Sequence, residues 1–222
     1  MKIAVKNKSY EDVLKIKKPA HKNPIKPWGF LRWVIRVGSL PSLIKTKFSY
    51  TTERMEEWNG EPALILMNHS SFTDLKIVHA IFKKTPFCIV TTTDGFIGFG
   101  MSLLMRLIGC IPTQKFVTDA TLVRDIHYAL TELKCSVLMF PEASYSFDGT
   151  ATPLPESLGK CLKLLQVPVI HVMANGAFAR DPLYNGLQIR KAKVSAHVKY
   201  LFKPEEIKEK HAKVLNAELA EA

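Results

Sequence analysis

Short apolar runs alternate along the chain with longer stretches of helical periodicity. The apolar runs predict strands at residues 63–67, 87–92, 110–113, 137–140, 167–173 and 194–202. Helical patterns lie between them, at 72–83, 98–107, 118–133 and 156–165, and a Lys- and Glu-rich helix begins at Pro204. This alternation predicts an α/β fold, with a central, largely parallel mixed sheet flanked by helices.

The first 50 residues have a different character from the rest. Residues 1–27 form a basic leader, with a short helix expected at 10–16, and residues 28–44 are typical of an amphipathic helix. This helix carries two tryptophans and two arginines, as helices that lie in a membrane interface do. It is too short, and too interrupted by arginine and Pro41, to span a bilayer. It either inserts in the membrane interface or packs on the domain formed by residues 51–222.

Charge and composition narrow the choice of partner. The net charge is +11, and the first 50 residues hold 12 basic and 2 acidic residues against 19 and 18 in the remainder. A basic arm indicates an anionic partner. No nucleic-acid-binding motif accompanies it, so we expect an anionic membrane surface and no nucleic acid. The four cysteines form no C-x-x-C pair and are expected to be reduced thiols. No secretory signal is recognisable at the N-terminus.

A histidine and an aspartate follow the first buried strand, within Asn68-His69-Ser70-Ser71-Phe72-Thr73-Asp74. His69 can act as a general base, and Asp74 can accept the other ring N–H and fix its tautomer. The spacing also permits a purely structural interpretation. Ser71 and Asp74 match a helix capping box, with His69 as an ordinary loop residue.

Three further blocks follow in a fixed order: Gly109 to Lys115, which contains G-C-I-P; Phe140 to Ser146, which reads F-P-E-A-S-Y-S; and Val167 to Ile170, V-P-V-I. Together with the H-x4-D block at His69, this order resembles the glycerophospholipid acyltransferase superfamily, in particular the 1-acylglycerol-3-phosphate acyltransferase type. The resemblance covers roughly residues 60–175.

The resemblance implies a membrane-associated O-acyltransferase of phospholipid biosynthesis, peripheral on the cytoplasmic face of the membrane. It would move a fatty acyl group from acyl-CoA or acyl-acyl carrier protein to a lysophospholipid hydroxyl. No bound cofactor, metal or covalent acyl-enzyme is implied. His69 and Asp74 would be the catalytic residues. The residues implied in substrate binding are Gly109, Lys115, Glu142, Ser144 and Tyr145.

The third block departs from the family pattern F-P-E-G-[TS]-R-S at the position that grips the acceptor phosphate. Tyr145 stands where the family has arginine, and a phenol supplies no charge for a phosphate. Either Lys115 is the remaining cation, or the acceptor lacks that phosphate. A non-catalytic lipid-binding relative is the alternative from another class, although the intact His69 and Asp74 pair argues against it.

Overall fold

The computed structural model describes residues 11, 20–93, 96, 98–114, 120–146, 148–150, 152–181 and 189–222. Their strands form one seven-stranded sheet in the order β1-β7-β6-β2-β5-β3-β4. The strands are β1 Ser49–Glu53, β2 Leu64–Met67, β3 Phe87–Thr92, β4 Cys110–Thr113, β5 Ser136–Met139, β6 Val169–Asn175 and β7 Ser195–Phe202. All neighbours pair in parallel except β6 and β7, so the sheet is largely parallel and mixed, as the sequence predicts.

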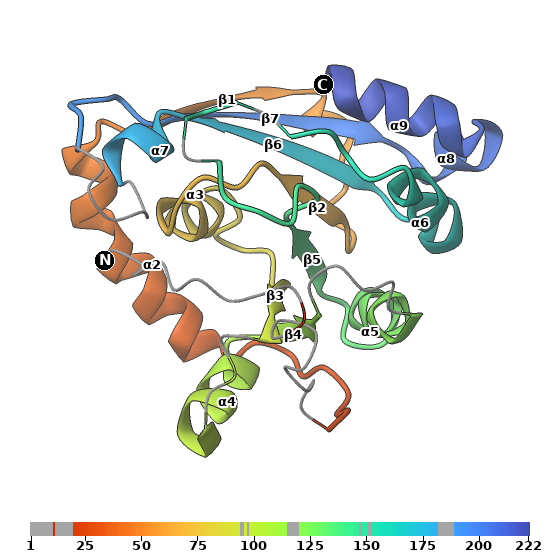
Figure 1. The fold of residues 1–222 in the computed structure, drawn as a ribbon, viewed down its shortest axis with the longest axis horizontal. Helices are drawn as coiled ribbons and strands as arrows, with labels where there is room; N and C mark the ends of the chain where they lie inside the picture. The colour runs from red at the N-terminus through yellow and green to blue at the C-terminus, as the bar shows by residue number, and fades with distance from the viewer. Residues whose placement is uncertain are drawn as a thin grey trace.

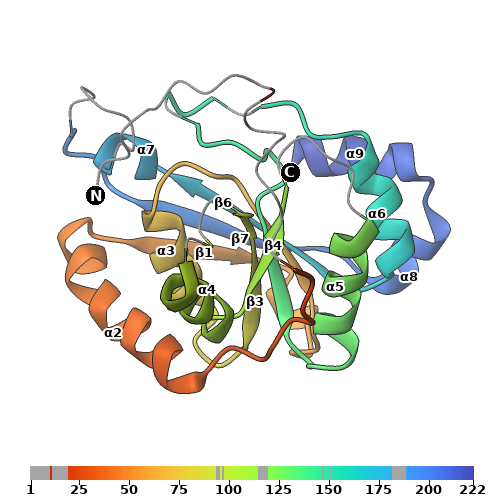
Figure 2. The ribbon, with the colours of Figure 1, turned by 60° about the horizontal axis from the view of Figure 1, so that its bottom comes forward.

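Helices cover both faces of this sheet (Figure 1). They are α2 Gly29–Lys45, α3 Thr73–Ile81, α4 Gly98–Leu107, α5 Ala120–Thr131, α6 Ser157–Leu165, α7 Ala177–Arg180, α8 Pro204–Glu209 and α9 Ala212–Glu221, with a 3-10 turn at Met55–Glu57. Figure 2 shows α2, α3 and α4 on one side of the sheet, and α5, α6, α8 and α9 on the other.

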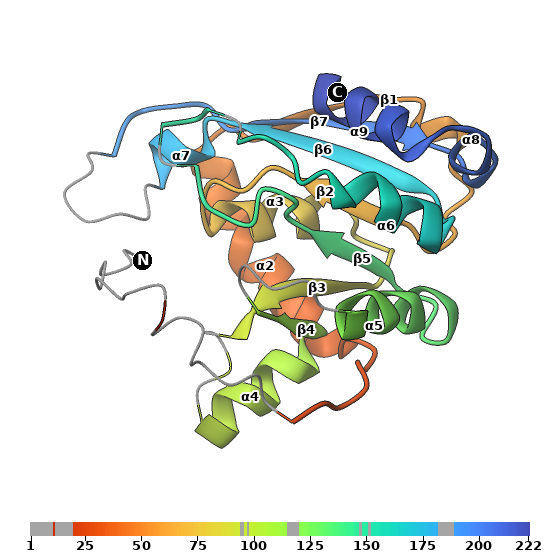
Figure 3. The same cartoon turned by 45° about the vertical axis from the view of Figure 1, so that its right-hand side comes forward.

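Each face of the sheet has its own hydrophobic core. Strand β2 contributes to both, because successive side chains of a strand point to opposite faces. Ile65 and Met67 pack in the core beneath α2 and α3, whereas Leu64 and Leu66 pack beneath α5, α6 and α9. All four are fully buried, which explains the unbroken apolar run. The central position of β2 places the loop that follows it in the middle of the domain (Figure 3).

Most of the expected elements are present, with three corrections. Residues 49–53 form the edge strand β1, which the polar sequence SYTTE does not reveal because all five residues are exposed. Residues 177–180, for which the sequence predicted no helix, form the short helix α7. The C-terminal helix is two helices, broken at Lys210 and His211 by extended backbone. The short helix expected at 10–16 lies outside the described residues, apart from Glu11.

Residues 20–28, which precede α2, contact the domain. The backbone N–H of Trp28 donates to the carbonyl of Leu107 at the end of α4, and His21 contacts the buried carboxylate of Asp125 on α5 at 2.9 Å. Helix α2 itself buries Ser39 and Leu43 against the domain. Its outer face exposes large apolar side chains: Trp28 just before it, then Phe30, Trp33, Val34, Val37, Leu40 and Ile44. No helix among the described residues is long and apolar enough to cross a membrane.

Candidate active site

The junction between β2 and α3 brings His69 and Asp74 into direct contact. His69 Nδ1 lies 2.9 Å from Asp74 Oδ2, and the side chains are 17% and 0% exposed. The same carboxylate accepts hydrogen bonds from the backbone N–H groups of Ser70 and Ser71, at 2.7 and 2.9 Å, and from Ser70 Oγ at 3.0 Å. These donors compensate the cost of burying the carboxylate and hold it in one orientation.

This arrangement sets the tautomer of His69. Because Asp74 accepts, Nδ1 carries the hydrogen, and Nε2 of the neutral ring presents its lone pair. No residue that the structure describes hydrogen-bonds to Nε2. A partly exposed imidazole with Nε2 available and Nδ1 held by a carboxylate is the arrangement of a general base.

Asp74 also has the structural role that the sequence allows. Its contact with the N–H of Ser71 forms one half of a capping box, and Ser71 Oγ accepts from the N–H of Thr73 at the start of α3. The two interpretations of this block are therefore compatible, since one carboxylate caps the helix and orients the histidine.

Two aromatic rings enclose the imidazole of His69. The Phe140 ring stacks on it with centroids 3.8 Å apart, and the Tyr145 ring lies 3.9 Å away at 35°. Rings of this size cannot share one face of an imidazole at such distances, so one lies on each face. Stacking of this kind stabilises a ring plane by about 0.5–1.5 kcal/mol per pair. Both rings come from the third block, which thus completes the surroundings of His69.

The rest of the third block forms a turn beside His69. The backbone N–H of Ser146 donates to the carbonyl of His69 at 2.7 Å, which joins the first and third blocks. Ala143, where the family has glycine, has a φ of +53°. The carboxylate of Glu142 accepts from the backbone and the hydroxyl of Thr152, and the hydroxyl of exposed Ser144 donates to the carbonyl of Glu142. Glu142 and Ser144 therefore belong to the block that encloses His69, but their hydrogen bonds stay within the loop between β5 and α6.

The structure does not place Gly109, the first residue of the second block, beside His69. Gly109 precedes β4, whereas His69 follows the carboxyl end of β2, so the two lie at opposite ends of parallel strands. Gly109 has a φ of +85°, and a Cβ there would lie 3.1 Å from the Pro27 side chain. The fold itself therefore requires glycine at this position. Lys115 lies outside the described residues.

Asn68 is a site residue to which the sequence alone assigned no role. Its side-chain amide donates to the carbonyl of Ala174 at 2.9 Å and accepts from the N–H of Ala174 at 2.7 Å. This double contact extends the pairing of β2 with β6 by one side chain and fixes the backbone immediately before His69. The signal in the sequence that could have indicated this role is a polar amide directly after a buried strand.

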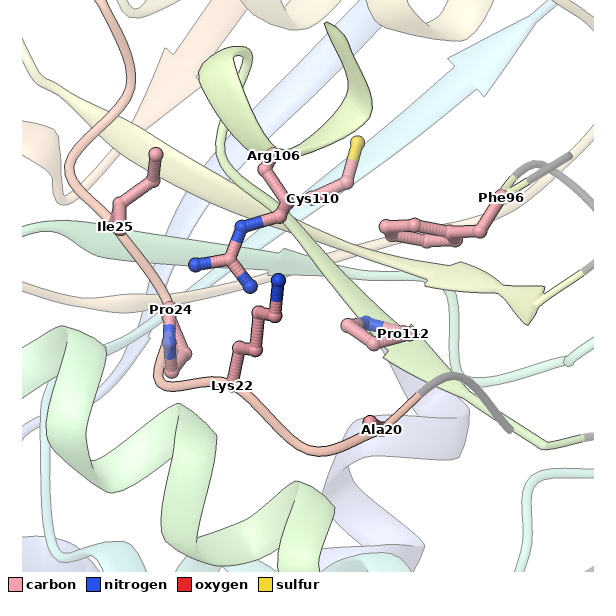
Figure 4. A pocket seen from close by; sticks show the side chains of 8 residues that line it. All are labelled: Ala20, Lys22, Pro24, Ile25, Phe96, Arg106, Cys110 and Pro112. Carbon is pink, nitrogen blue, oxygen red and sulfur yellow. The ribbon is translucent and has the colours of Figure 1, made fainter. Parts of the chain in front are cut away.

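A cavity of about 210 Å³ lies beside the second block, between residues 20–25 and β4. Figure 4 shows the amino group of Lys22 and the guanidinium of Arg106 close together inside it, with Ile25, Phe96 and Pro112 around them. Cys110 also lines it, and burial raises the pKa of this thiol to about 12, so the thiol is a poor nucleophile. Strands β5 and β3 separate β4 from β2, so this cavity is distinct from the site at His69.

Comparison with known proteins identifies the class of this protein. A sequence model of the family described as Acyltransferase matches residues 47–174, more than half of the chain, and the chain therefore belongs to that family. No curated protein sequence matches it. Among solved structures, its fold is similar to that of the 1-acyl-sn-glycerophosphate (LPA) acyltransferase PlsC from Thermotoga maritima. The TM-score is 0.64 at 15% identity, over 86% of this chain and 76% of that one.

Proposed function

We propose that this acyltransferase moves a fatty acyl group from an acyl thioester to the hydroxyl of a lysophospholipid or a related lipid. The observation that carries the proposal is the His69–Asp74 contact, with Nε2 of a partly exposed histidine left available at the centre of a domain of this family. The thioester is acyl-CoA or acyl-acyl carrier protein. Neither donor is distinguished by a feature of the described residues.

The reaction follows from the chemistry of the pair. His69 Nε2 takes the proton of the acceptor hydroxyl as its oxygen attacks the thioester carbonyl carbon. A C–O bond forms, the C–S bond breaks, and the departing thiolate takes the proton from the imidazolium. Asp74 stabilises the imidazolium between these steps and keeps the ring oriented. No acyl-enzyme forms, because the histidine acts only as a proton carrier.

The acceptor is proposed to be other than lysophosphatidic acid, or broader than it. Tyr145 brings an aromatic ring to the face of His69, where the family's arginine would bring a cation for the acceptor phosphate. A phenol donates one hydrogen bond and has no positive charge, so it binds a phosphate more weakly than a guanidinium does. A panel of acceptors tests this, and a clear preference for lysophosphatidic acid over neutral lysolipids would contradict it.

The decisive experiment is an acyl-transfer assay on the purified protein in detergent, with both donor types and the acceptor panel. His69→Ala is assayed beside the wild type, and a His127→Ala variant, altered at an exposed histidine of α5, is the matched control. We expect transfer by the wild type and the control and none by His69→Ala. If no donor and acceptor pair reacts while vesicle binding persists, the non-catalytic lipid-binding alternative takes precedence.

Docking on the cytoplasmic face of the membrane is part of the proposal. The outer face of α2 exposes seven large apolar side chains in and just before the helix, and no residue of α2 is acidic. An amphipathic helix with arginines beside tryptophans fits the interface of an anionic leaflet. Deletion of residues 1–44 should abolish vesicle binding, and unchanged binding would refute this role.

A further inference from the structure

A small polar cavity lies at the inner edge of α2, away from the catalytic pair. Its volume is about 120 Å³, enough for a phosphate group, and its described lining residues are Gly29, Arg32, Trp33, Arg36, His79 and Lys83. Three of these are cationic and none is acidic. Gly29, Arg32, Trp33 and Arg36 follow a helical spacing, so they form one stripe of α2. Lys83 and His79 approach it from the end of α3.

The cations around this cavity are uncompensated. Neither Arg36 nor Lys83 forms an ion pair or a hydrogen bond with a residue that the structure describes. Arg32 and Arg36 are like charges four residues apart on one helix, an unfavourable pair. Burial lowers the pKa of the Arg32 guanidinium, and the charge of Arg36 acts in the same direction. A bound anion would relieve this repulsion.

The inner wall of the cavity is held in place by Arg32. Arg32 Nη2 donates to the carbonyls of Phe82 and Thr85, which fixes the guanidinium against the loop after α3. Its Nε is buried and has no hydrogen-bond partner among the described residues. His79 is 5% exposed, and its Nδ1 donates to the Leu75 carbonyl at 2.8 Å, so its ring forms part of the wall and supplies no hydrogen bond to an anion.

We propose that this cavity binds the phosphate of an anionic phospholipid headgroup at the membrane surface. The lipid source follows from the position of the cavity, because the stripe that lines it runs beside the exposed apolar stripe of the same helix. Trp33 belongs to both. A lipid with its phosphate in the cavity would lay its acyl chains along Phe30, Val34 and Val37. The inference goes beyond the acyl-transfer chemistry and rests on membrane docking through α2.

Neighbouring lysines allow a matched test. Lys83 lines the cavity and Lys84 does not, although both are exposed. On α2, Arg36 lines the cavity, whereas the exposed Lys45 does not. The full chain with Arg36→Gln and Lys83→Gln is compared with the chain carrying Lys45→Gln and Lys84→Gln. Each variant loses two positive charges, so the general attraction to an anionic surface falls by about fivefold per charge in both.

Binding is measured by sedimentation with phosphatidylcholine vesicles that contain about one third phosphatidylglycerol, at fixed salt. We expect the cavity variant to bind at least about tenfold more weakly than the matched control. On pure phosphatidylcholine, the two should bind alike. Equal losses in both variants, or no vesicle binding by the wild type, would overturn the proposal.

A free phosphate is the other source of the same chemistry, and calorimetry with inorganic phosphate separates it. Phosphate binding that the cavity variant loses, without any selective loss of vesicle binding, would overturn the lipid assignment. Acyl transfer in detergent, measured on the same proteins, keeps the two proposals distinguishable. The cavity variant should retain transfer, whereas His69→Ala should lose transfer and retain vesicle binding.

Discussion

The ring of Tyr145 lies against the imidazole of His69, with centroids 3.9 Å apart, at the sequence position where the family carries arginine. The substitution therefore does more than remove a charge from the acceptor site. It places a second aromatic ring on His69, opposite Phe140, and confines the imidazole to a plane in which Nδ1 meets Asp74. We therefore propose that Tyr145 positions His69.

Three substitutions at Tyr145 separate the effect of an aromatic ring at this position from the effect of a positive charge. Tyr145→Phe keeps the ring, so we expect kcat within about twofold of the wild type. Tyr145→Ala removes a contact worth about 0.5–1.5 kcal/mol, and kcat should fall about two- to tenfold. Tyr145→Arg should lower kcat, because the ring is lost. It should also lower the KM for lysophosphatidic acid relative to the KM for neutral lysolipids, because a guanidinium can bind the phosphate.

The measurement is steady-state kinetics of the three variants on the same acceptor panel. The separation of kcat from KM is the critical readout, because a merely structural role would change stability without this pattern. If Tyr145→Ala and Tyr145→Phe had equal kcat values, the ring would have no part in positioning His69.

The sequence predicted the strands with buried residues well and missed the fully exposed edge strand β1. Strand β2 is readable because all four residues are buried in a parallel sheet, whereas the exposed residues of β1 leave no pattern. At the site, the spacing and the family resemblance correctly predicted that Asp74 contacts a ring nitrogen of His69. The stacking of Phe140 and Tyr145 on His69 depends on how the loop after β5 packs on the loop after β2, which is a tertiary contact that no local pattern encodes.

Asp74 should matter for stability as well as for activity. The Asp74→Asn amide cannot accept all four of the hydrogen bonds that the carboxylate now accepts, and its N–H₂ group would face other donors. Buried groups left unpaired cost about 1–3 kcal/mol each, so we expect a loss of about 2–4 kcal/mol together with nearly complete loss of transfer. Urea unfolding measures it, with His69→Ala as the control that leaves three of the bonds intact. A fully stable, active Asp74→Asn protein would contradict both roles.

Ala143 occupies a backbone conformation that suits glycine. Its φ of +53° costs a residue with a Cβ about 1–2 kcal/mol, partly offset by the greater freedom of glycine in the unfolded chain, about 0.4–1 kcal/mol. Ala143→Gly, which restores the family residue, should therefore stabilise the protein by up to about 1 kcal/mol. Thermal unfolding would detect this, and a lower midpoint would show that the turn needs the methyl group.

Two helical glycines should respond to alanine in opposite ways. At Gly159 on α6, a Cβ would lie 2.1 Å from the carbonyl oxygen of Ala212, whereas nothing lies within 4 Å of a Cβ at Gly38 on α2. Gly159→Ala must push α6 away from α9, at a cost of about 1–3 kcal/mol or more. Gly38→Ala should instead stabilise the protein by about 0.5–1 kcal/mol through helix propensity. Chemical unfolding of both variants checks the pair. A Gly159→Ala protein that is as stable as the wild type would show that α6 and α9 are not in this close contact, and a destabilised Gly38→Ala protein would contradict the open space at that position.

Acid should destabilise the fold through His171 on β6. Burial, aided by the charges of His197 and Lys199, lowers the pKa of His171 from 6.5 to about 4. Burial likewise lowers the pKa of His79. Both groups favour the neutral form in the folded state, so their contribution to stability is fully present above pH 6.5. It is lost as the pH falls from 6.5 towards 4, because the unfolded chain takes up the proton first.

The variant His171→Leu isolates this contribution. Nδ1 of His171 is buried without a partner among the described residues, so leucine removes a titrating group without breaking a hydrogen bond at that atom. Each pH unit within the window costs the wild type up to about 1.4 kcal/mol for this one group, and the variant should lose stability less steeply, with the His79 contribution left. Urea unfolding at pH steps from neutral down to about pH 4 measures both slopes. Above pH 7, the protonation of His171 should make no contribution to the pH dependence of stability, so the two proteins should show the same slope. Identical slopes below it would mean that His171 takes up its proton as readily in the folded protein as in the unfolded chain.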